Sequence, residues 1–156
     1  MRIRFLAIRN TLWASALTLL VMGLTAGGLF AQSKKPDFSG QWEIDKEKST
    51  RPDVVTETIG HKEPKVVITS TPANGDSFTI RLTTDGKDNL NIVGGREMTA
   101  QTKWEGDKLV TLVRDPKGMQ FIEVRSLSED GHVQTIEGFM DPGRKQAMFR
   151  RVMVKR

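Results

Sequence analysis

Cysteine and tyrosine are absent from the 156 residues, and histidine occurs only twice. Without cysteine, no disulfide can stabilise the fold, no thiol can act as a nucleophile, and no lipid can be attached to an N-terminal cysteine as in lipoproteins. The chain must therefore hold itself together by burying apolar side chains, which its length allows within one domain.

The two histidines lie far apart in the sequence, and each is close to a turn. His61 stands in GHKEPK and His132 follows SEDG. We expect both side chains to be solvated. Because a metal site needs three or four converging ligands, we predict no bound metal and no cofactor.

Catalytic motifs are equally scarce. The sequence has no Gly-x-Ser-x-Gly motif and no glycine-rich phosphate loop followed by a helix. Glu123 and Glu137 are expected on neighbouring strands, where surface pairing with Arg125 or Lys145 is favoured over a catalytic pair of carboxylates. The sequence therefore predicts no enzymatic activity and no catalytic residues.

The start of the chain differs in composition from the rest. Three arginines within the first nine residues precede an uncharged, largely apolar run over residues 11–31, which ends among small side chains. This pattern predicts a signal peptide over residues 1–31, cleaved after Ala31, and a single domain over residues 32–156. An uncleaved membrane anchor is the alternative, because about 20 apolar residues can span a bilayer.

Removal of this segment changes the charge of the protein. Of the formal charge of +5, three positive charges belong to Arg2, Arg4 and Arg9, which leaves +2 on the remaining domain. So small an excess gives no basis for binding nucleic acid. We expect a periplasmic or secreted protein without stable membrane insertion after cleavage, or, in the alternative, one anchored by its N-terminus.

Turn motifs recur through the chain at intervals of roughly 10–13 residues, the spacing of consecutive antiparallel strands. Each combines glycine with asparagine, aspartate, glutamate or proline, as tight hairpins require. They are PANGD (72–76), TTDGK (83–87), VGGRE (93–97), WEGDK (104–108), DPKG (115–118), SEDG (128–131) and DPGR (141–144).

The segments between these turns alternate apolar and polar residues. SFTIRLT (77–83) and MTAQTKW (98–104) are clear examples, and valine, isoleucine, threonine and phenylalanine are enriched in the others. The pattern predicts an all-β fold: an antiparallel up-and-down meander of about 8–10 strands. Short connections favour closure into a barrel over a two-sheet sandwich.

The stretch DFSGQWEID (37–45) resembles the first strand of lipocalin-like barrels, which carries Gly-x-Trp, here Gly40 and Trp42. The wider pattern is similar to small secreted bacterial barrels of this lipocalin-like (calycin) type. The resemblance implies that the tryptophan closes one end of the barrel under an arginine or lysine from the C-terminal strand. Alternation in AMFRRVMV makes Arg151 the expected partner, with Arg150 as the alternate. The second motif of lipocalins, Thr-Asp-Tyr, is not matched.

The resemblance also implies an interior that either holds a small ligand or is filled by side chains. The function we predict is binding of a small apolar or amphiphilic molecule; the alternative is a filled-core module of the cell envelope with a protein partner whose identity the sequence does not indicate. Seven apolar residues are expected to line the interior: Met98, Trp104, Met119, Phe121, Phe139, Met148 and Phe149.

Overall fold

A computed structural model of the protein describes residues 34–156; the predicted signal peptide and its cleavage site lie outside these residues. The described chain contains ten strands. They are β1 (Gly40–Ile44), β2 (Val54–Lys62), β3 (Lys65–Pro72), β4 (Phe78–Thr83), β5 (Asp85–Val93), β6 (Arg96–Glu105), β7 (Lys108–Arg114), β8 (Gln120–Leu127), β9 (Val133–Phe139) and β10 (Phe149–Lys155). None of the described residues forms a helix long and apolar enough to cross a membrane.

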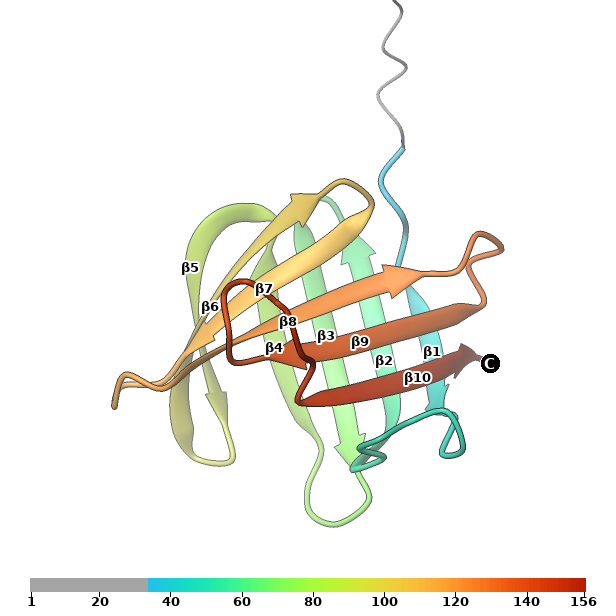
Figure 1. Ribbon diagram of the computed structural model, residues 1–156, viewed down its shortest axis with the longest axis horizontal. Helices are drawn as coiled ribbons and strands as arrows, with labels where there is room; N and C mark the ends of the chain where they lie inside the picture. Colours follow the sequence, from blue (N-terminus) through green and yellow to red (C-terminus); the bar gives the residue numbers. More distant parts are fainter. Residues whose placement is uncertain (1–33) are drawn as a thin grey trace, which may run out of the picture. The chain divides into compact units, whose positions relative to one another are not determined.

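The strands form one antiparallel sheet that curls into a barrel (Figure 1). Its order is β4-β3-β2-β1-β10-β9-β8-β7-β6-β5, so each strand pairs with its neighbours in sequence except β4 with β5, and β1 pairs with β10. All seven turn motifs lie at connections between consecutive strands. The predicted all-β meander of 8–10 strands is confirmed.

The two edge strands, β4 and β5, are joined by side chains instead of a backbone ladder. The Asn91 side chain on β5 accepts the N–H of Arg81 at 2.7 Å and donates to the Arg81 carbonyl at 3.0 Å. Asn89 accepts the N–H of Thr83 at 2.7 Å. These asparagines give β4 the partners that a neighbouring backbone would otherwise supply, and so bring the barrel close to closure.

One end of the barrel, which we call the closed end, is where β1 begins and β10 ends. Apolar side chains fill it, and most are almost completely buried: Phe38, Trp42, Ile59, Ile68, Leu109, Ile136 and Met153. Trp42 has no exposed surface, and its indole N–H donates to the Phe38 carbonyl at 3.0 Å. The cation above this indole is Lys155, with Nζ 5.3 Å from the ring centre, a contact typically worth about 0.5–2 kcal/mol.

Arg151 does not lie at this end, so the prediction that it stacks on Trp42 is wrong. Its side chain faces the interior, as the alternation indicated, but the register places Lys155 opposite Trp42. Four residues of extended strand put Arg151 about 13 Å nearer the other end. Gly40 lies where Lys155 passes: its φ is 140°, and a Cβ there would be 2.5 Å from Lys155 Cε.

The expectation that His61 is solvated is also wrong. Its side chain is 3% exposed, Nδ1 accepts the N–H of Phe38 at 3.2 Å, and Nε2 lies 3.0 Å from a Glu63 carboxylate oxygen. The same oxygen accepts the indole N–H of Trp104 at 2.8 Å. The Trp104 ring is stacked against those of Phe38 and His61, with centroids 6.1 and 6.0 Å away. Trp104 therefore closes the barrel end and does not line a cavity.

Phe139 lies on the outer face of the sheet instead of the inner one. It is buried among Val110, Ile122 and Val124, which alternate with the inward residues of β7 and β8. The β9–β10 loop, residues 140–148, turns back outside these strands (Figure 1), and Arg144 forms a two-point ion pair with Glu105 at 2.7 and 2.9 Å. Both faces of β7 and β8 therefore carry buried apolar residues here, and alternation in the sequence does not tell which of them point into the barrel.

Replacing Asn91 with alanine removes both side-chain hydrogen bonds to Arg81 and leaves two backbone groups of β4 without their partners. We expect the free energy of unfolding to fall by about 1–3 kcal/mol. Urea denaturation followed by tryptophan fluorescence measures it. The exposed Asn74→Ala in the β3–β4 loop should stay within about 0.5 kcal/mol of the wild type; equal losses for both variants would contradict the role given to Asn91.

The Glu105–Arg144 pair makes stability depend on pH. The hydrogen bond from Arg144 lowers the pKa of Glu105 from 4.5 to about 2 in the folded protein. A lowered pKa stabilises the fold above pH 4.5, and this contribution is lost as the pH falls toward 2. Glu105→Gln should therefore be less stable than the wild type at pH 6, with the difference shrinking across that window. Arg144→Gln should show the same pH dependence of stability. If the stability difference between either variant and the wild type did not change with pH, the ion pair would not be its cause.

Candidate functional site

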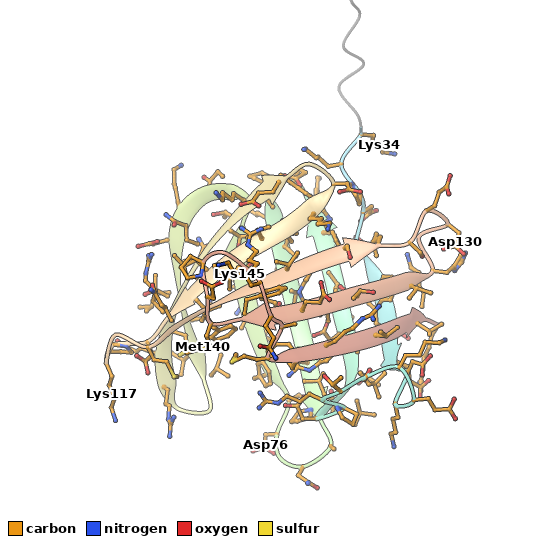
Figure 2. The ribbon with its side chains drawn as sticks, in the orientation of Figure 1. Lys34, Asp76, Lys117, Asp130, Met140 and Lys145 are labelled. Carbon is orange, nitrogen blue, oxygen red and sulfur yellow. The ribbon has the colours of Figure 1, made fainter. Side chains whose placement is uncertain are left out.

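A cavity of about 550 Å³ occupies the half of the barrel away from the closed end. It opens at the end that carries the β3–β4 and β7–β8 hairpins, which we call the mouth. Figure 2 labels Asp76 and Lys117 at the tips of these hairpins, and Lys34 and Asp130 on the opposite side of the barrel. Since the cavity is this large, the interior is not filled by side chains.

The wall of the cavity is mostly apolar. The apolar residues that form it come from β2, from every strand from β4 to β8, and from β10: Val54, Phe78, Ile80, Leu82, Val93, Met98, Ala100, Val113, Phe121 and Phe149, with Met119, Met140 and Met148 at the mouth. Five of the seven residues expected to line the interior are in this set. Trp104 and Phe139 are not, for the reasons given above. Flexible methionines at an opening suit ligands of varied shape.

Phe149 lies on the wall at the mouth, where a glycine makes room for it. A Cβ on Gly138, its cross-strand neighbour, would come within 2.1 Å of the phenyl ring, so any other residue there would force the ring to move. The guanidinium of Arg151 lies 4.6 Å from the centre of the same ring. Arg151 and Arg51 both pair with Asp53, at 2.8 Å each. Two cations share one carboxylate, so this group of three residues at the mouth has a formal charge of +1.

The inner end of the cavity holds a buried polar cluster. Arg125 on β8 donates to Glu57 on β2 at 2.7 and 3.3 Å, across the interior of the barrel. Its Nε donates to Glu123 at 2.7 Å, and a further N–H reaches the Gln134 carbonyl at 3.2 Å. Ser70 donates to Glu57 at 3.3 Å. The side chains of Arg125 and Glu57 are only 5% and 2% exposed.

Electrostatics favour the charged guanidinium in this cluster. Burial by itself lowers the pKa of Arg125, but Glu123 and Glu57 more than offset it, so the pKa lies above its ordinary value. Both carboxylates face the cavity together with Arg125. The expectation that Glu123 pairs at the surface is thus wrong: it pairs with Arg125, but inside the barrel. The signal for this was present, because Phe121, Glu123 and Arg125 alternate on one face of β8.

Comparison with known proteins establishes the fold. No family model and no curated protein sequence matches the chain. Among solved structures, a fatty acid transporter named REP1-NXSQ superposes with a TM-score of 0.59 at 14% identity, covering 77% of this chain and 96% of its own. A variant of that transporter gives 0.60 at 15%, covering 77% and 98%. A variant of the fluorescent protein UnaG gives 0.59 at 14%, covering 76% and 96%. The protein thus shares its fold with these β-barrels.

Removing the cation from the polar cluster leaves two carboxylates facing each other in a desolvated space. We expect Arg125→Met to lower the free energy of unfolding by about 3–5 kcal/mol, because an unpaired buried charge is strongly destabilising. Adding Glu57→Gln should recover part of that loss. Chemical denaturation measures both, with the exposed Arg150→Met as the matched control, expected within about 0.5 kcal/mol. A loss for Arg125→Met no greater than the control's would contradict the role of the ion pair.

Proposed function

We propose that this protein is an exported, non-enzymatic barrel that binds one small apolar or amphiphilic molecule in its cavity. The observation that carries the proposal is the cavity itself: an apolar wall around about 550 Å³, open at one end, with a polar cluster at the other. Small-molecule sites typically enclose about 300–1,000 Å³ and combine apolar walls with a few polar groups.

Two further observations support the proposal. The fold is shared with a fatty acid transporter, which makes a binding role a natural use of this cavity. Export is supported by the basic start and the uncharged run over residues 11–31. The alternative of a filled-core module with a protein partner has less support, because the interior is hollow.

Mass spectrometry on protein expressed with its own N-terminus tests both parts of the proposal. The denatured mass should correspond to a chain that begins at Gln32, and the native mass should exceed it by one small, extractable molecule. Ala100 lies on the cavity wall, so Ala100→Phe should reduce that bound fraction by about tenfold by filling the space.

Thr99→Phe is the matched control, since Thr99 is adjacent on β6 and is not on the cavity wall. It should retain the bound molecule. An intact N-terminus would refute cleavage and favour the anchored form. If the wild type neither carries a molecule nor takes up the neutral fluorescent probe N-phenyl-1-naphthylamine, the binding function is wrong.

A further inference from the structure

The charges at the inner end of the cavity indicate which chemical group of a ligand lies there; this inference rests on the proposed binding function. Glu57 and Glu123 face one guanidinium, that of Arg125. Two carboxylates and one guanidinium give the cluster a formal charge of −1. A low-dielectric space with excess negative charge disfavours another anion and favours a cation or a neutral hydrogen-bond donor.

Arg125 has little left to offer a ligand. It makes four hydrogen bonds, to Glu57, Glu123 and Gln134, which leaves one N–H of Nη2 without a partner among the described residues, and its side chain is 5% exposed. A ligand carboxylate could pair with the guanidinium through two hydrogen bonds only by displacing one of the two glutamates. The displaced glutamate would then be a desolvated charge without its partner, which costs several kcal/mol.

Glu123, in contrast, has an oxygen available. Oε1 accepts the Arg125 N–H, whereas within the described residues no hydrogen bond is made to Oε2. The Glu123 side chain is 16% exposed and forms part of the cavity wall, while Glu57 is 2% exposed and engaged at both oxygens. The nearby hydroxyl of Ser70 already donates to Glu57. The cavity therefore presents a free acceptor at its inner end.

The other charged group, at the mouth, has the opposite sign. Arg51 and Arg151 share Asp53, so this rim offers an excess cation close to solvent. A fatty acid bound there would place its apolar tail against the free carboxylate oxygen of Glu123. That oxygen would lose water without gaining a donor, which is unfavourable for a charged acceptor.

We propose that the cavity selects amphiphiles whose inner end donates a hydrogen bond, such as an amine or an alcohol, in preference to a carboxylic acid. Glu123 accepts that hydrogen bond and is the specificity-determining residue. The apolar part of the ligand then extends along the wall toward the methionines at the mouth. In this respect the cavity differs from what a likeness to a fatty acid transporter alone would suggest.

Competition among ligands of equal chain length tests the proposal. Dodecylamine, 1-dodecanol and dodecanoic acid, each below its aggregation concentration, are titrated against bound N-phenyl-1-naphthylamine. The amine should bind at least about tenfold more tightly than the acid, with the alcohol also ahead of the acid, because a charge-assisted hydrogen bond is worth at least this factor. This comparison uses the unmodified protein, so it does not depend on the folding of a variant.

Glu123→Gln should reduce the preference for the amine over the acid by about tenfold. Glu137→Gln on β9 is the matched control: Glu137 is not on the cavity wall, and the variant should keep the wild-type preference. Tighter binding of the acid, or an unchanged preference in Glu123→Gln, would overturn the inference and leave the binding function standing. Failure of the probe and all three ligands to bind would overturn the binding function itself.

Discussion

The buried guanidinium of Arg125 determines how the inside of the barrel is organised. Its neutralisation requires carboxylates, and these come from Glu57 on β2 and from Glu123 on its own strand. Because β1, β10 and β9 separate β2 from β8 in the sheet, the ion pair ties two distant strands together through the interior. On one side of it apolar side chains fill the closed end, and on the other the cavity begins. One pair of charges thus marks the boundary between core and site.

The same use of polar side chains explains how the sheet closes. Edge strands left unpaired invite association with other chains, and a ten-stranded meander has two of them. Between these two edges, Asn89 and Asn91 on β5 accept backbone N–H groups of β4. Their side chains thus supply hydrogen bonds that a neighbouring strand would otherwise make. Side-chain amides can rearrange more readily than a ladder, and the barrel is therefore tied less rigidly along this line than anywhere else in the sheet.

Sequence patterns predicted the fold because most of its strands alternate regularly and end at glycine-containing turns. They did not single out β2 or β5. In β2 a bulge between Val54 and Thr56 breaks the alternation, and Glu57 and His61 face inward where apolar residues are expected. In β5 two positions are taken by Asn89 and Asn91, whose side chains bond to the backbone of β4, so the strand lacks a clear apolar alternation. The partner of Trp42 was predicted wrongly for another reason. Alternation tells which face of the sheet Arg151 occupies, but its distance from the closed end depends on the register between β1 and β10, which are more than 100 residues apart in the sequence.

The two halves of the barrel contribute differently: the packed closed end supplies most of the stability, and the other half contains the cavity. A chain without disulfides depends on burial, and the closed end supplies it through Trp42, Phe38 and the aliphatic core around them. The cavity half contributes less, because side chains that line a cavity lack protein contacts on one side. An occupant that fills this space restores those contacts and stabilises the folded state by mass action. The polar cluster makes that gain selective. An apolar chain is accepted anywhere along the wall, whereas the group that reaches Arg125 and Glu123 meets two carboxylates around one guanidinium and a Glu123 oxygen that accepts no hydrogen bond within the described residues.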